Sequence, residues 1–166
     1  MAMARTVCSV VLFCAVSLLP LVAVADDSEF QIEGCVYCDT CRFGFETDAS
    51  EYIPGATVKI ECKDRVTLRS EEVAKAVTDK GGRYRVTVKG DRQDQQCLAK
   101  LVDSPMSGCQ EQDPGRSSAT VILTRSNGAA SNRHFANAMG FLRSQPLPGC
   151  AALRKRYLAD GDFKSI

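Results

Sequence analysis

The sequence predicts an all-β protein, an antiparallel β-sandwich or barrel of about seven strands that is stapled by disulfides. Apolar and polar residues alternate along several segments, Gly and Pro residues lie between those segments, and nine cysteines occur among 166 residues. An alternation with a period of two places successive side chains on opposite faces of a strand. It is therefore typical of sheets that bury one face and expose the other.

The alternation is clearest in three segments, 30–38, 56–62 and 83–89. Shorter strands are expected at 65–68, 73–77, 97–102 and 119–124, and only 151–158 has a weakly helical pattern. Pro54-Gly55 and Asp79-Lys80-Gly81-Gly82 supply residues suited to tight turns. Short strands at such intervals favour a sandwich or a barrel.

The first residues, 1–25, are expected to be a signal peptide. Arg5 precedes an apolar stretch that ends in Ala23-Val24-Ala25, a small-x-small cleavage pattern. A membrane anchor is the alternative, because about 18 apolar residues approach the length that spans a bilayer. The interruption at Pro20 and the cleavage pattern favour the signal peptide.

Residues 26–166 are then expected to form a single β domain, with a core at about 30–153 and a C-terminal tail at 154–166. The expected location is the extracellular space, without membrane insertion once the signal is cleaved. The whole chain carries a net charge of +1, and removal of Arg5 makes the mature chain formally neutral. Such a balance argues against nucleic acid as a partner.

The pattern of titratable residues gives no indication of an enzyme. His134 is the single histidine and follows the loop-like Asn132-Arg133, with no Gly-x-Ser-x-Gly motif elsewhere. We interpret it as a solvated loop residue. We expect no catalytic residues, no cofactor and no resident metal.

Seven cysteines remain after signal cleavage, namely Cys35, Cys38, Cys41, Cys62, Cys97, Cys109 and Cys150. A zinc site needs a second close pair of ligands, and a thioredoxin-like Cys-x-x-Cys normally opens a helix in a βαβ unit. Haem attachment needs His where Arg42 stands. Structural disulfides in an oxidising compartment are the preferred interpretation.

Strand geometry separates Cys35 from the other cysteines. Cys38 and Cys62 fall on the apolar faces of their strands, whereas Cys35, three residues before Cys38, points to the opposite face of a regular strand. Cys35 is therefore the odd cysteine of seven. Spacing alone does not choose among the many pairings of the rest.

Residues 33–42, Glu-Gly-Cys-Val-Tyr-Cys-Asp-Thr-Cys-Arg, resemble the signature of the pollen Ole e 1-like family of secreted plant proteins. The signature positions are Gly34, Val36, Tyr37, Cys38, Asp39, Cys41 and Arg42. The similarity continues to about Leu153. The spacing of Pro54-Gly55-Ala56 and of Thr78-Asp79 before Tyr84 is also similar to transthyretin-like and carboxypeptidase-regulatory-like sandwiches.

The family resemblance implies three disulfides, Cys38–Cys109, Cys41–Cys150 and Cys62–Cys97. Cys35 is extra to that framework, so we expect either a monomer with an unpaired thiol or, as an alternative, a dimer linked through Cys35. Many relatives carry an N-glycan. We expect none here, because Asn127, Asn132 and Asn137 all lack Ser or Thr two residues later.

The resemblance also implies a function. We expect a secreted, non-enzymatic pollen or anther protein, a signalling or structural protein in pollen hydration, germination or pollen-tube growth, and a potential pollen allergen. Its expected partner is the ectodomain of an extracellular receptor kinase, contacted through the polar loops 43–51 and 110–118. The alternative is a cell-wall module that binds polysaccharide, to which the basic run Arg154-Lys155-Arg156 is suited.

Overall fold

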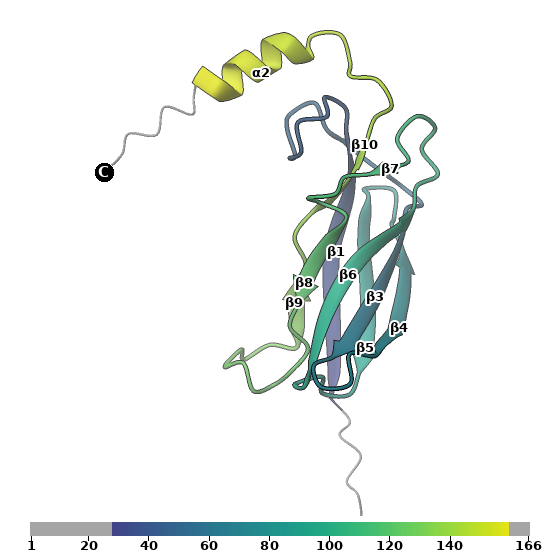
Figure 1. Cartoon of the computed structure of the whole chain (residues 1–166), viewed down its shortest axis with the longest axis vertical. Coiled ribbons are helices and arrows are strands. Elements are labelled where there is room, and N and C mark those ends of the chain that lie inside the picture. Colours follow the sequence, from purple (N-terminus) through teal and green to yellow (C-terminus); the bar gives the residue numbers. More distant parts are fainter. Residues whose placement is uncertain (1–27, 160–166) are drawn as a thin grey trace, which may run out of the picture.

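The computed structural model describes residues 28–159, in which two β-sheets pack face to face and one helix follows (Figure 1). The strands are β1 (Glu29–Asp39), β2 (Glu51–Tyr52), β3 (Thr57–Asp64), β4 (Ser70–Val77), β5 (Arg83–Lys89), β6 (Gln95–Asp103), β7 (Glu111–Gln112), β8 (Ser118–Val121), β9 (Arg133–Phe135) and β10 (Met139–Leu142). The helix is α2 (Cys150–Ala159). The predicted all-β sandwich is confirmed, whereas the predicted signal peptide lies outside the described residues.

β1 is the central strand of the first sheet. Its first half pairs with β5 on one side and β9 on the other, and its second half pairs with β2 and β10. Phe30, Ile32 and Val36 are buried, while Gln31, Glu33 and Cys35 are more exposed. The period-two pattern thus identified the strand and its buried face correctly as far as Val36, whereas Tyr37, expected on the polar face, is buried as well.

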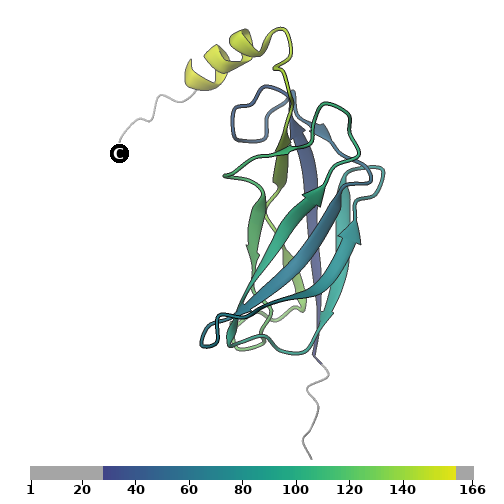
Figure 2. The same cartoon turned by 45° about the vertical axis from the view of Figure 1, so that its right-hand side comes forward.

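The prediction of purely antiparallel pairing is wrong for two strands, because β9 and β10 run parallel to β1. The chain descends along β8 in the second sheet, crosses over through residues 122–132 and re-enters the first sheet in the direction of β1 (Figures 1 and 2). A parallel pair needs such a crossover connection. Nothing in the local pattern of 133–135 or 139–142 indicates that direction.

The second sheet has the order β4-β3-β6-β8 and is antiparallel throughout. Its inner face supplies Val58, Ile60, Ala99 and Leu101 to the core, all at most 4% exposed. These side chains pack with Phe30, Ile32, Val88 and Phe141 of the first sheet, among others. The core therefore lies between the sheets.

The strand expected at 65–68 is a turn, and β8 ends at Val121, three residues before the expected end. The Asp64 carboxylate accepts hydrogen bonds from the backbone N–H groups of Val66 and Thr67, at 2.9 and 2.6 Å. Leu68 follows with a φ of 59°. An Asp side chain that binds the backbone two and three residues later favours a turn over a strand, so the β-branched residues here were misleading.

Glu61 makes the second sheet sensitive to acid. Its carboxylate pairs with Lys100 Nζ and with Lys59 Nζ, the latter at 2.8 Å. These hydrogen bonds lower the pKa of Glu61 from its ordinary 4.5 to about 2. Because the folded pKa is depressed, the stabilisation is present above about pH 4.5 and is lost as the pH falls towards 2.

We therefore expect Glu61→Gln to lower the free energy of unfolding at pH 7 by about 1 kcal/mol, the scale of partly exposed ion pairs. The difference from wild type should shrink between pH 4.5 and pH 2. Urea unfolding at pH 7, 4 and 3 measures it. Glu71→Gln, on the neighbouring strand, is the control. A difference that stays constant over this range would contradict the assignment.

Within residues 28–159, the structure contains no helix with the length and apolar character that a membrane span requires.

Candidate functional site

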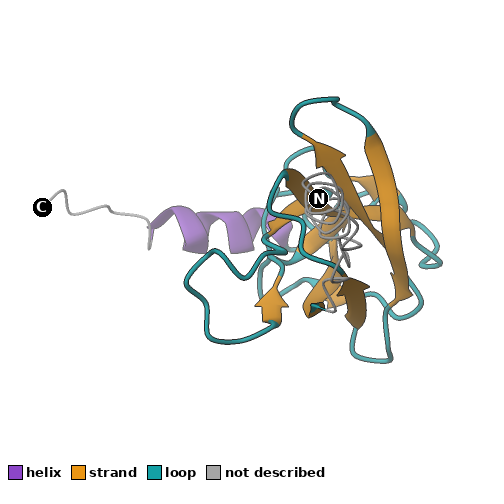
Figure 3. Ribbon diagram, turned by 90° about the horizontal axis from the view of Figure 1, so that it is seen from below, coloured by secondary structure: helices purple, strands orange, loops and turns teal. Residues whose placement is uncertain are grey.

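The end of the sandwich at which β1 terminates carries most of the long connections. The β1–β2 loop (residues 40–50), β7 and α2 all lie at this end (Figures 1 and 2). Seen from below, α2 projects to the side beyond the two sheets (Figure 3). Both loops predicted from the sequence as recognition surfaces, 43–51 and 110–118, are therefore at one end of the molecule.

Two disulfides hold this end together. Cys38–Cys109 joins β1 to the β6–β7 connection, with 6.0 Å between the Cα atoms. Cys41–Cys150 joins the β1–β2 loop to the first residue of α2, with 5.4 Å between the Cα atoms. The third disulfide, Cys62–Cys97, links facing residues of β3 and β6. The structure thus brings together the three pairs that the family resemblance implies, and Cys35 has a free thiol.

The signature residues of β1 are structural. A Cβ atom at Gly34 would stand 2.5 Å from the hydroxyl oxygen of Tyr84, so only glycine leaves room for that ring. Tyr37 is 1% exposed and its ring covers Gly140 of β10, where a Cβ would lie 2.8 Å from it. Burial raises the pKa of Tyr37 to about 12. Val36 and Cys38 are fully buried in the core.

The next signature residues shape the β1–β2 loop. The buried carboxylate of Asp39 accepts hydrogen bonds from the N–H groups of Cys41, at 3.1 Å, and Gly44, at 2.7 Å. The Thr40 hydroxyl donates to the carbonyl of Ala49, at 2.7 Å, across the loop. The loop is therefore held by internal hydrogen bonds as well as by Cys41.

Arg42 connects three separate segments at this end. Its guanidinium donates to both carboxylate oxygens of Glu111 in β7, at 2.7 and 2.9 Å, and to the carbonyl of Arg143, at 2.8 Å. The hydrogen bonds from Arg42 lower the pKa of the Glu111 carboxyl. A two-point contact of this kind fixes orientation better than a single ion pair. The two predicted loops are therefore joined.

A groove lies between α2 and the β1–β2 loop. Its volume is about 720 Å³, and its walls are formed by Cys41, Arg42, Phe43, Phe45, Pro146, Arg154 and Tyr157. The Phe45 ring stands edge-on to Tyr157, with centroids 5.6 Å apart, and its centroid is 5.9 Å from that of Phe43. Phe45 is 37% exposed, so this aromatic cluster is accessible to a partner.

The groove has a positively charged edge. Arg156 pairs with Asp48 at 2.5 Å, and the Tyr157 hydroxyl accepts a hydrogen bond from the Asp48 N–H at 3.2 Å. Arg154 and Lys155 have no ion-pair partner within residues 28–159. Aromatic rings beside unpaired cations are common at protein recognition sites, where Tyr, Phe and Arg are enriched. We name this region, Phe43, Phe45, Arg154 and Tyr157, the aromatic groove.

The sequence pattern did not predict the part of the groove that α2 supplies. The expected tail begins at 154, but α2 continues across that position to Ala159 and presents Arg154 and Tyr157 to the groove. The i, i+4 spacing of Leu153 and Tyr157 could have indicated this longer helix, because such a spacing places both side chains on one helix face. These two are the more buried side chains between 151 and 157. The loop 110–118 does not line the groove; β7 within it pairs with β10.

His134 is not the solvated loop residue that the sequence predicted. It lies in β9 and is half-buried, and its ring centroid is 5.6 Å from that of Phe30. Its Nε2 is buried and has no hydrogen-bond partner within residues 28–159. The parallel pairing of β9 with β1 places it against the core, an arrangement that local sequence does not show.

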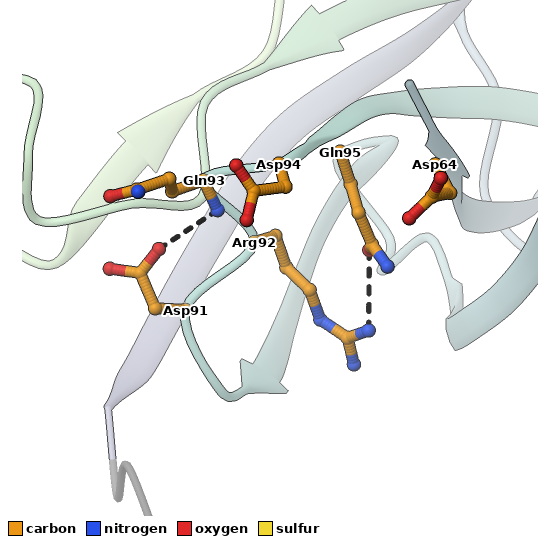
Figure 4. A pocket seen from close by; sticks show the side chains of 6 residues that line it. All are labelled: Asp64, Asp91, Arg92, Gln93, Asp94 and Gln95. Carbon is orange, nitrogen blue, oxygen red and sulfur yellow. Dashed lines mark hydrogen bonds between the residues drawn. The ribbon is translucent and has the colours of Figure 1, made fainter. Parts of the chain in front are cut away.

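The opposite end of the sandwich has a polar hollow of about 460 Å³, shown in Figure 4. Two of its three carboxylates hold turns: Asp64 binds N–H groups of its own turn, and Asp91 accepts from the N–H of Gln93 at 2.9 Å. Arg92 donates to Gln95 Oε1 at 3.3 Å. No three His, Cys, Asp or Glu side chains within residues 28–159 are grouped as a metal site requires. The aromatic groove is therefore the better candidate.

A family model described as "Pollen protein Ole e 1 like" matches residues 28–158. The chain belongs to this pollen Ole e 1-like family. It is 67% identical to Protein DOWNSTREAM OF FLC of Arabidopsis thaliana, over 99% of this chain and 100% of the relative. It is 44% identical to Pollen allergen Cro s 1 of Crocus sativus, over 85% of this chain and 87% of the allergen.

A solved member of the Ole e 1-like family has the same fold. The crystal structure of the major plantain pollen allergen Pla l 1 matches 74% of this chain and all of its own, with a TM-score of 0.67 and 29% identity. The family resemblance and the disulfide-stapled β-sandwich are thereby confirmed. The chain is a pollen-related protein of a family that includes pollen allergens.

Proposed function

We propose that the protein is a secreted, non-enzymatic pollen or anther protein that binds the ectodomain of a cell-surface receptor kinase through the aromatic groove. In this role it acts in pollen hydration, germination or pollen-tube growth. The observation that carries the proposal is the aromatic groove itself, a partly exposed cluster of three rings beside an unpaired Arg154.

The rigidity of the surroundings supports recognition of a protein surface. Cys41–Cys150 fixes the start of α2 on the β1–β2 loop. The Asp39 carboxylate accepts hydrogen bonds from two N–H groups of that loop, those of Cys41 and Gly44. A surface that is already ordered loses little conformational entropy when it binds, so more of the contact energy appears as affinity. Aromatic and Arg side chains most often contribute the largest share of that energy.

Binding of the labelled protein to plasma-membrane vesicles from pollen tubes tests this function. We expect saturable binding that is lost when the vesicles are shaved with a protease. Phe45→Ala should weaken it about tenfold or more, because truncation of a central aromatic residue commonly costs about 2 kcal/mol or more. Phe135→Ala, which removes an exposed ring far along the first sheet, is the matched control and should bind like wild type.

An acidic cell-wall polysaccharide is the second candidate, because Arg154 and Lys155 have no described carboxylate partner. Immobilised, de-esterified pectin distinguishes it from a receptor. If Phe45→Ala and Arg154→Gln bind the vesicles normally but lose salt-sensitive binding to pectin, the receptor proposal is wrong and the polysaccharide function is supported. Retention of vesicle binding after protease treatment also counts against a receptor.

A further inference from the structure

The crossover between β8 and β9, residues 122–132, carries the dipeptide Asn127-Gly128 in an exposed turn. Both residues are exposed, and Gly128 has a φ of +76°. A Cβ atom at Gly128 would meet nothing within 4 Å. The crossover lies at the end of the sandwich opposite to α2 (Figure 1). The backbone nitrogen that follows Asn127 is therefore not shielded by a side chain.

That nitrogen is also free of hydrogen bonds. The N–H of Gly128 donates to no acceptor in the described part of the chain. The turn around it is nevertheless held, because the Asp91 carboxylate accepts from the N–H of Arg125 at 3.0 Å. An N–H group without a partner loses its proton to base without first breaking a hydrogen bond. The Gly128 nitrogen is therefore available as a nucleophile.

The side-chain amide of Asn127 is placed as the matching electrophile. Its Oδ1 accepts a hydrogen bond from the N–H of Ala129 at 2.8 Å. An Asn side chain bonded to the backbone two residues later folds back over the residue between them, here Gly128. The donated hydrogen bond also stabilises the negative charge that develops on Oδ1 when Cγ is attacked. The turn thus holds the two reacting groups next to each other.

The other two asparagines of the chain, Asn132 and Asn137, lack this combination. Asn132 is followed by Arg133, whose N–H donates to Ser131 Oγ at 3.1 Å. Asn137 is followed by Ala138, which carries a half-buried side chain. The side-chain oxygens of both accept no hydrogen bond within residues 28–159. They serve as internal references for the reactivity of Asn127.

We propose that Asn127 is a self-modification site, at which the protein converts this residue to aspartate and isoaspartate without an enzyme. The deprotonated Gly128 nitrogen attacks Asn127 Cγ, a new C–N bond forms and the bond from Cγ to Nδ2 breaks. The leaving nitrogen takes up a proton and departs as ammonia, which leaves a cyclic succinimide. Water then opens the ring at either of its carbonyls. The reaction consumes one water, releases one ammonia and needs no oxidant.

The modification changes the charge and the backbone of the crossover. The product carries a negative charge that Asn127 lacks, on a loop where Arg125 has no ion-pair partner among the residues described. β8 ends at Val121 and β9 begins at Arg133, so the longer isoaspartyl backbone lies outside every strand. The two sheets and the aromatic groove keep their structure, and the proposal is independent of the proposed function.

Incubation of the purified protein at pH 7.4 and 37 °C, followed by peptide mapping with mass spectrometry, tests the proposal. We expect aspartate and isoaspartate to accumulate at position 127 about tenfold faster than at positions 132 and 137. The rate should be higher at pH 8 than at pH 6, because the attacking nitrogen must be deprotonated. Transfer of a labelled methyl group by an isoaspartate-specific carboxyl methyltransferase identifies the isoaspartyl product.

Two variants separate ring closure from simple hydrolysis of the amide. Gly128→Ala places a methyl group beside the attacking nitrogen and should slow the reaction about tenfold. Asn127→Gln lengthens the side chain, which removes the alignment with the Gly128 nitrogen, and should yield no modified product at this position. Circular dichroism verifies that both variants fold.

Equal rates at the three asparagines, or a rate in Gly128→Ala equal to that of wild type, would overturn the proposal. Aspartate without isoaspartate would overturn it as well, because direct hydrolysis of the amide gives only aspartate. Vesicle binding by Asn127→Gln reports on the aromatic groove alone. Failure of this inference and failure of the proposed function are therefore distinguishable.

Discussion

The double variant Cys38→Ala/Cys109→Ala should lose about 4 kcal/mol in free energy of unfolding. The disulfide closes a segment of 71 residues, and the chain-entropy treatment assigns a loop of that length about 4 kcal/mol at 25 °C. Both cysteines are fully buried in the core. Because domains of this size are stable by about 5–15 kcal/mol, the loss is a large share of the total. Equilibrium urea unfolding measures it.

Two comparisons show whether the loss comes from the disulfide or from cysteine replacement as such. Cys35→Ala removes a free, half-buried thiol and should change the stability by less than about 1 kcal/mol. Cys62→Ala/Cys97→Ala opens a shorter loop of 35 residues and should cost about 0.6 kcal/mol less than the first double variant. A first double variant as stable as Cys35→Ala would refute this expectation.

Gly82→Ala should destabilise the protein by about 3 kcal/mol. Gly82 has a φ of +69°, which costs a residue with a side chain about 1–2 kcal/mol. A Cβ there would also stand 2.7 Å from the Cβ of Tyr52 and 2.9 Å from the carbonyl oxygen of Val36. Relief of these contacts moves backbone, and such overpacking costs about 1–3 kcal/mol more.

Gly82 lies next to the point at which the pairing of β1 changes from β5 to β2. Its carbonyl accepts the hydrogen bond of the Val36 N–H at 2.8 Å, and the Val36 carbonyl accepts from Ile53 at 3.0 Å. Gly90→Ala is the matched control, because its φ is +83° but its Cβ would meet nothing within 4 Å. We expect Gly90→Ala to cost only about 1 kcal/mol in urea unfolding. Equal losses in the two variants would show that crowding at Gly82 is unimportant.

The long strands were predictable because their signal is local. In β1, β3 and β5 the buried residues alternate with more exposed ones over much of each strand, as the amino-acid pattern does. The segment 65–68 shows the limit of that method. Its residues have strand propensity, yet the Asp64 carboxylate binds their backbone N–H groups and makes a turn.

The aromatic groove was predictable only in part. The sequence identified the loop 43–51 by its polarity and its place next to cysteines, and this loop supplies Phe43 and Phe45. Tyr157 reaches Phe45 because Cys41–Cys150 joins residues 109 positions apart. Distances across such a separation depend on the whole chain, so no window of residues reports them. His134 was misjudged for the same reason, since its burial depends on the parallel pairing of β9 with β1.

The sequence by itself determined the all-β class, the strand faces and, through its signature, the family and the cysteine framework it implies. These properties depend on residue type and short spacing, which are local. Tertiary structure alone decided the parallel return of β9 and β10 and the meeting of α2 with the β1–β2 loop. Each of these depends on how the two sheets pack, because burial and charge pairing arise only when distant segments share one volume.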